Sequence, residues 1–192
     1  MTSARVRLVS GRLVDLLDLR ADDIDFESGA IALSRLARYN GHTRADVHPY
    51  SVAEHSVHVS KHCAPQDALW GLLHDFPESL IGDCVGPLKN LPFMDGYRHI
   101  ERYIMGRVCE AAGLPQVCPK SVDEADFRLL RTEMRDLTAY EVEQDHPEMQ
   151  SFARAQIAAI QKDAIPELDL RNPWSAPVAA ERFLLRFHEL RR

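Results

Sequence analysis

The sequence lacks the cysteine spacing that marks a zinc ribbon or a redox-active pair. Its four cysteines, which include no CxxC pair, are Cys63, Cys84, Cys109 and Cys118. Because such sites need closely spaced thiols, the pattern argues against a cysteine-type zinc site and against disulfides. We expect reduced cysteines that serve as small apolar residues in the fold.

Long apolar runs and an excess of positive charge are also missing. No stretch approaches the roughly 18 apolar residues of a membrane span, and the N-terminal MTSARVRLVSGR lacks the apolar core of a signal peptide. With 23 Lys and Arg against 29 Asp and Glu, the net charge of −6 disfavours long contact with a nucleic-acid polymer. We expect a cytoplasmic protein with no membrane contact, whose ligand is a small molecule that needs only a few local cations.

The chain shows no internal repeat, low-complexity tract or Gly/Ser linker that would mark a domain boundary. Its 192 residues, 45% of them hydrophobic, suffice for one domain with a core and are few for two. We expect a single domain over residues 1–192, with a β-hairpin in 1–20, a helical core in 25–165 and a turn and helix in 166–192.

Hydrophobic patterning predicts a mainly α fold with a small N-terminal β-hairpin. The hairpin is indicated by RVRLVSGRLVDLLD, which alternates around a turn at Ser10-Gly11. The remaining periodic segments predict helices. These are expected from Asp25 or Ser28 through Ala37 with an end at Asn40-Gly41, from Ser51 to before Pro65, from about Asp67, and over about 95–113, 121–142, 147–162 and 177–190.

Two short patterns predict local structure more closely. Ser51-Val-Ala-Glu54 matches the capping box, in which each of the two side chains hydrogen bonds to the other residue's backbone N–H. Pro77 lacks a backbone donor, so it should interrupt its helix and cause a kink or a restarted turn at 76–78, closed by Gly82.

The stretch LWGLLHDFPESLIGD, residues 69–83, holds more ligand-type side chains than a core helix needs. The short turn near Pro65 should pack the two neighbouring helices together and bring His55 opposite His74 and Asp75. Imidazole with carboxylate suits Mn, Fe, Co, Ni or Zn. A fourth ligand is required, and spacing alone does not choose among Asp123, Glu124 and Asp126.

Four stretches together resemble the HD-domain phosphohydrolase superfamily. They are His55 in YSVAEHS, His74-Asp75 in LLHDFPES, Gly82-Asp83, and Asp126 in EADFRLLRTE. The pattern extends over about residues 6–140 and is most similar to the small branch with 5′-deoxynucleotidases and phage deoxyadenosine triphosphate hydrolases. The resemblance implies an HD-domain helical bundle whose metal ligands are His55, His74, Asp75 and Asp126.

Two further carboxyl groups are candidates for catalysis, and the resemblance implies matching Glu and Asp positions. Glu78 is four residues after His74, so it can share a helical face with the ligands and orient a water molecule. Asp83, next to Gly82, can protonate a leaving 5′-oxygen if nearby negative charge raises its pKa. The simpler interpretation is an exposed acid at Glu78 and a turn residue at Asp83.

Cations must also hold the phosphate groups. Our candidates are Arg38, at the end of the helix before His55, Lys89 in GPLKN, and with less support His42. Ordinary surface cations are the alternative for these positions. The remaining histidines form no second HD-type pair, so we expect solvated or structural roles for His48, His58, His62 and His99.

The C-terminal segment predicts a turn near Trp174 and an amphipathic helix. Its apolar face can pack on the core or on a partner subunit. That face consists of Ala180, Phe183, Leu184, Phe187 and Leu190. Oligomers occur in the similar branch, which is consistent with a homo-oligomer.

The sequence thus predicts a phosphohydrolase for deoxyribonucleoside 5′-phosphates, with one divalent transition metal (Co, Mn, Zn, Fe or Ni) per subunit. Monophosphate hydrolysis fits, and so does phosphate removal from a dNTP such as dATP, for which additional Mg²⁺ is expected. A nucleotide-sensing module without turnover is the main alternative. An HD-fold oxygenase with a di-iron centre would require further ligands that the sequence does not display.

Overall fold

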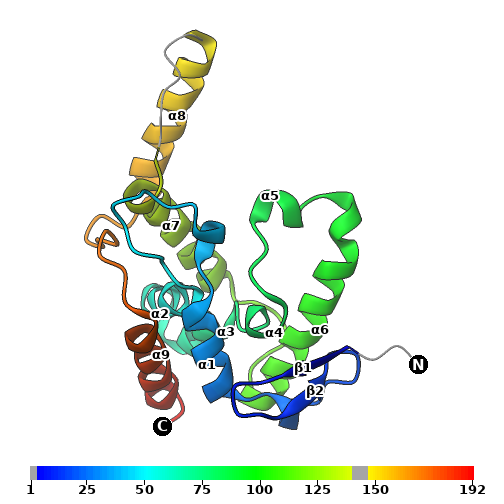
Figure 1. Ribbon diagram of the computed structural model, residues 1–192. Helices are drawn as coiled ribbons and strands as arrows, with labels where there is room; N and C mark the ends of the chain where they lie inside the picture. The colour runs from blue at the N-terminus through cyan, green and yellow to red at the C-terminus, as the bar shows by residue number, and fades with distance from the viewer. Residues whose placement is uncertain (1–3, 140–146) are drawn as a thin grey trace.

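The computed structural model describes residues 4–139 and 147–192, and these form a mainly α fold with a small N-terminal hairpin, as predicted (Figure 1). The strands are β1 (Arg5–Arg7) and β2 (Leu13–Asp15). The helices are α1 (Phe26–Arg35), α2 (Val52–His62), α3 (Ala68–Leu73), α4 (Glu78–Ile81), α5 (Gly86–Lys89), α6 (Asp95–Ala112), α7 (Lys120–Leu137), α8 (Pro147–Asp163) and α9 (Ala176–Leu190). Short 3₁₀ turns occur at Ala21–Asp23, Arg38–Gly41, Pro65–Asp67 and Pro92–Met94.

The predicted hairpin forms, with its turn around Ser10-Gly11. β1 and β2 are antiparallel, with Val6 opposite Val14. Gly11 has a φ of 86°, a left-handed conformation that glycine adopts without a steric penalty. The hairpin lies beside α6 at the end of the molecule away from α8, which extends outward from the other helices (Figure 1).

Helix α1 begins as predicted but ends earlier than predicted. The Asp25 side chain accepts a hydrogen bond from the Ser28 backbone N–H at 2.9 Å, which caps the first turn. The helix stops at Arg35, because the next residues pair with the chain at the start of α2. The Leu36 carbonyl accepts from the Val52 N–H at 3.0 Å. The predicted end at Asn40-Gly41 was therefore wrong.

Helix α2 is buried along nearly its whole length, from Val52 to Ser60. It packs against α1, α3, α7 and α9, so every face of the helix meets another element. Ser51 caps it by accepting from the Glu54 N–H at 3.2 Å. The capping box also predicts a hydrogen bond from the Ser51 N–H to the Glu54 side chain. Instead, the Glu54 carboxylate accepts from the Trp174 N–H at 2.7 Å.

Pro77 interrupts the helix as predicted. Helix α3 ends at Leu73, four residues form a turn, and α4 starts at Glu78 and ends before Gly82, whose φ is 83°. The ligand-type residues 74–83 therefore lie at a break between two short helices, where their side chains can leave the core. Residues 86–89 form an additional short helix that the sequence did not predict.

The later helices largely follow the predicted ranges. Helix α7 ends at Leu137, before the predicted end at 142, and positions 140–142 lie outside the described residues. In α9, Phe183 and Phe187 are buried against the core formed with α1 and α2, as is Ala179, whereas the predicted Ala180 is only half-buried. This apolar face is therefore used within the chain. No helix in the described ranges is long and apolar enough to cross a membrane.

Candidate metal centre

Two histidines and an aspartate from two packed helices converge where α2 meets the turn after α3. The Nε2 atoms of His55 and His74 are 3.2 Å apart. The Asp75 Oδ2 atom lies 3.5 Å from Nε2 of His55 and 3.2 Å from that of His74. These three residues can together hold a metal ion.

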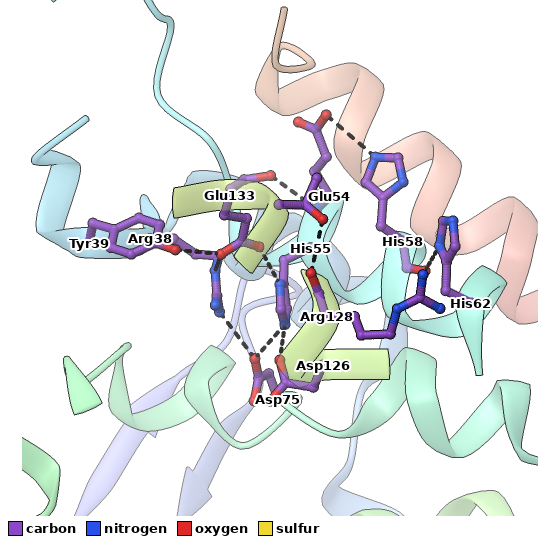
Figure 2. Close-up of polar contacts among 12 residues, drawn as sticks. Arg38, Tyr39, Glu54, His55, His58, His62, Asp75, Asp126, Arg128 and Glu133 are labelled. Carbon is purple, nitrogen blue, oxygen red and sulfur yellow. Dashed lines mark hydrogen bonds and ion pairs between the residues drawn. The ribbon is translucent and has the colours of Figure 1, made fainter. Parts of the chain in front are cut away.

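Helix α7 brings a fourth potential ligand, a second carboxylate, to the same point. Oδ1 of Asp126 lies 3.1 Å from Nε2 of His55 and 3.9 Å from Nε2 of His74. The other two candidates point elsewhere, since Asp123 accepts from the Cys118 thiol and Glu124 pairs with Lys120. Figure 2 shows His55 between Asp75 and Asp126 on one side and Glu133 on the other.

The spacing of these donor atoms fits a first-row divalent ion. Ligand atoms about 2.1 Å from an ion are separated by about 3.0 Å at right angles and about 3.4 Å in a tetrahedron. Four separations among the two histidine nitrogens and the carboxylate oxygens run from 3.1 to 3.5 Å, and the fifth, from His74 Nε2 to Asp126 Oδ1, is 3.9 Å. Two imidazoles with two carboxylates suit several ions of this class, so the donor set leaves the metal's identity open.

The second nitrogen of each histidine ring is held by a hydrogen-bond acceptor. His74 Nδ1–H donates to the Gly71 carbonyl at 2.8 Å, and His55 Nδ1–H donates to Oε1 of Glu133 at 2.6 Å. With protons on both Nδ1 atoms, each Nε2 has a free lone pair that points into the cluster. Metal-binding histidines are usually oriented in this way.

Glu133 is the functional residue that sequence reasoning missed. Its side chain is fully buried in α7, and its Oε2 atom accepts from Arg38 Nε at 3.1 Å and from the Tyr39 hydroxyl at 2.8 Å. A usable clue was present, because Glu133 follows Asp126 by seven residues and so lies on the same side of a helix. An acid at that spacing from a predicted ligand is a candidate for orienting another ligand.

The charges in the cluster shift each other's pKa values strongly. Burial alone would raise the pKa of Asp75, but His74, His55 and Arg38 hold it well below its usual range. Burial and Arg38 act to lower the pKa of His55, yet Glu133 and Asp126 raise it to about 9. Protons therefore compete with a metal ion for these nitrogens.

Glu78 and Asp83 are both drawn toward the neutral form. Burial, followed by the charges of Asp75 and Asp83, raises the pKa of Glu78 to about 10. Burial and Asp75 also raise the pKa of Asp83, against the opposing charge of Arg38. Glu78 is only 5% exposed, and its Oε2 atom has no hydrogen-bond partner among the described residues. The interpretation of Glu78 as an exposed acid was therefore wrong.

A cavity of about 730 Å³ lies over the cluster, within the range of small-molecule sites. Arg38, His42 and Lys89 all line it, together with Glu78 and Asp83. The structure places Arg38 in a 3₁₀ turn and not at a helix end, where its Nη1 atom lies 3.5 Å from Asp75. Lys89 forms an ion pair with Glu101 at 2.5 Å.

The other histidines have the structural or solvated positions that were expected. His58 is buried and its Nε2 lies 3.8 Å from the Glu54 carboxylate, while Nδ1 of His62 bonds to the His58 carbonyl. His48 and His99 are exposed.

Comparison with curated proteins places the chain among related sequences. No family model matches it. It is 38% identical over 132 residues to an uncharacterized protein of Rhodobacter capsulatus, and the match covers 65% of this chain and 66% of that protein. It is also 35% identical over 132 residues to the uncharacterized protein YfdR of Escherichia coli strain K12, covering 69% of this chain and 71% of that protein. The chain therefore belongs to the same protein family as YfdR.

Proposed function

We propose that the protein is a metal-dependent phosphohydrolase of the HD-domain type that acts on deoxyribonucleoside 5′-phosphates. The observation that carries this proposal is the convergence of His55, His74, Asp75 and Asp126 at one wall of a cavity that also contains cations and two further carboxyl groups. Such a combination can bind a phosphate ester and hydrolyse it. The HD-type sequence pattern supports the same assignment.

The cluster residues would hold the ion, and the cavity residues would act on the substrate. When bound there, a divalent ion would acidify a neighbouring water molecule and withdraw charge from a phosphoryl oxygen. Water attacks phosphorus while the bond to the 5′-oxygen breaks. Glu78, buried beside Asp75, orients the water, and Asp83 transfers a proton to the departing oxygen. Its raised pKa suits a proton donor.

Arg38 has a double role in this proposal. Two of its nitrogen atoms contact Glu133 and Asp75, which fixes the guanidinium beside the cluster. Its hydrogen bonds to the described residues use Nε and Nη1, which leaves Nη2, and Arg38 lines the cavity. That atom can donate to a phosphoryl oxygen, as a planar guanidinium commonly does.

The test is metal-dependent turnover. The protein is stripped of metal and reconstituted separately with Mn, Co, Zn, Fe, Ni or Mg, and release of phosphate, pyrophosphate and triphosphate is measured from dNMPs, dNTPs and ribonucleotides. We expect activity with at least one metal and its loss in Asp75→Ala. Glu124→Ala, which changes an exposed acid of α7, serves as the matched control and should retain activity. Tight metal binding without turnover on any nucleotide would refute the proposal and favour a sensing module.

A further inference from the structure

One face of α7 runs along the cavity and changes character along its length. Asp126, Leu130, Met134 and Thr138 all line the cavity and are spaced four residues apart. Residues at this spacing form a stripe along one side of a helix, so Leu130 and Met134 lie about 6 and 12 Å from Asp126 along the axis. The cavity wall is thus charged at the metal-ligand end and apolar one to two helical turns away.

Further residues without charge line the cavity near Asp83 in the chain. They are Val85, Gly86 and Pro87, separated from Asp83 by Cys84. Because Asp83 is the proposed proton donor to the leaving oxygen, the leaving alcohol should extend toward these residues. An apolar part of that alcohol would then have these residues and the Leu130 and Met134 side chains to contact in the cavity.

Donors for phosphate groups are few. Among the described residues, the cationic side chains that line the cavity are Arg38, Lys89 and His42. Arg38 already contacts Glu133 and Asp75, and Lys89 is paired with Glu101. In the sequence, residues 140–153 contain no lysine or arginine that could add a permanent cation.

The existing ion pairs reinforce this limit. Arg38 faces Glu133 and Asp75, and Lys89 faces Glu101, so carboxylates already offset both permanent cations. Glu78 and Asp83 add no positive charge in either protonation state. A phosphate monoester carries up to about two negative charges, and a triphosphate about twice as many. Among the described residues, no unpaired lysine or arginine in the cavity would bind the second and third phosphoryl groups.

We infer that the cavity binds a phosphate monoester with an apolar ring, the phosphoryl group beside the metal ligands and the ring on Leu130 and Met134, and that it disfavours a triphosphate. This inference rests on the proposed function and specifies its substrate class. A deoxyribonucleoside 5′-monophosphate has the required parts, since the sugar separates the phosphate from a flat base.

The first experiment compares each dNMP with its dNTP on the metal-loaded protein, by turnover and by equilibrium binding, with and without Mg²⁺. We expect the dNMP to be favoured at least about tenfold in kcat/KM and in affinity under both conditions. Equal or tighter dNTP binding under either condition, or triphosphate release as the main reaction, would overturn the inference. If nothing is hydrolysed but the dNMP still binds at least about tenfold more tightly, the proposed function fails while the assigned ligand class stands.

The second experiment tests the ring site by removing it from either side. Deoxyribose 5-phosphate has the same reacting end as a dNMP but no base, and we expect its KM to be at least about tenfold higher. Met134→Ala should raise KM about fivefold for the dNMP and by clearly less for the sugar phosphate. Leu185→Ala removes a comparable apolar side chain that is 62% exposed on α9, and it should leave both substrates unaffected. Equal effects of Met134→Ala on the two substrates would refute the ring site.

Discussion

Replacing Glu133 by glutamine tests how the site depends on a residue that does not touch the ion. The change keeps the size of the side chain but leaves one acceptor oxygen in place of two. In the wild type, Oε1 serves His55 while Oε2 serves Arg38 and Tyr39. The amide must therefore direct its NH₂ group at one of these two sides.

Both orientations harm the site. If the NH₂ group faces Arg38, two donors meet and a buried guanidinium loses its main counter-charge, which leaves only the ligand Asp75 beside it. If the NH₂ group faces His55, Nδ1 must become the acceptor, the ring proton moves to Nε2, and Nε2 can no longer bind a metal ion. Loss of a partner that orients a ligand typically lowers metal affinity about 10- to 100-fold. Removing one partner of a buried ion pair costs about 3 kcal/mol or more in free energy of unfolding.

The assay is competition between the protein and a chelator of known metal affinity, together with denaturant unfolding of the same samples. Glu124→Gln makes the same chemical change on an exposed part of α7, where the side chain pairs with Lys120, and should match the wild type in both measurements. Tyr39→Phe removes one of the three hydrogen bonds to Glu133 and keeps the His55 acceptor, so its metal affinity should stay within about threefold of wild type. A folded Glu133→Gln protein that binds metal as tightly as wild type would refute the reasoning.

Three other predictions follow from single features. Saturating metal at about 100 times its Kd should raise the free energy of unfolding by about 2.7 kcal/mol, and a chelator should reverse this in thermal melts. Gly29→Ala would place a Cβ atom 2.1 Å from Phe76 and should cost about 1–3 kcal/mol in unfolding experiments, whereas Gly96→Ala has open space and should be neutral or stabilising. Asp25→Ala should cost about 1 kcal/mol at neutral pH. Burial acts to raise the pKa of Asp25, but hydrogen bonds from Ser28 hold it below 3.8. The stability difference between wild type and Asp25→Ala should therefore be present above pH 3.8 and vanish as the pH falls through the lower, folded-state pKa. A constant difference in the free energy of unfolding down to about pH 2 would contradict this.

Features that depend on a few neighbouring residues could be predicted from the sequence. The turn at Gly11, the cap at Asp25 and the break at Pro77 each follow from the backbone chemistry of one residue type, and the structure contains all three. The meeting of His55 with His74 and Asp75 also followed, because the turn between their helices is too short to let them separate.

Features that depend on distant partners could not be predicted. Local pattern assigned the Glu54 carboxylate to its own helix end, but the Trp174 N–H, 120 residues away in the sequence, binds it instead. The end of α1 was misplaced for the same reason, since Leu36 pairs with Val52 across a long loop and leaves the helix. Local propensities differ by less than the free energy of satisfying a buried hydrogen-bonding group, so the tertiary partner determines the outcome.

The Arg38 contacts link the two parts of the site that the sequence treated separately. As a surface cation, Arg38 would offer its whole guanidinium to a phosphate, and the number of phosphate groups would remain open. In the fold, Glu133 and Asp75 each take part of it, and Glu133 also orients His55. Glu133, which orients His55, thus also reduces the positive charge that Arg38 can offer to a substrate. Metal-ligand orientation and a preference for a single phosphoryl group would then depend on the same buried residue, which is why Glu133→Gln and the dNMP-to-dNTP comparison should be measured on the same preparations.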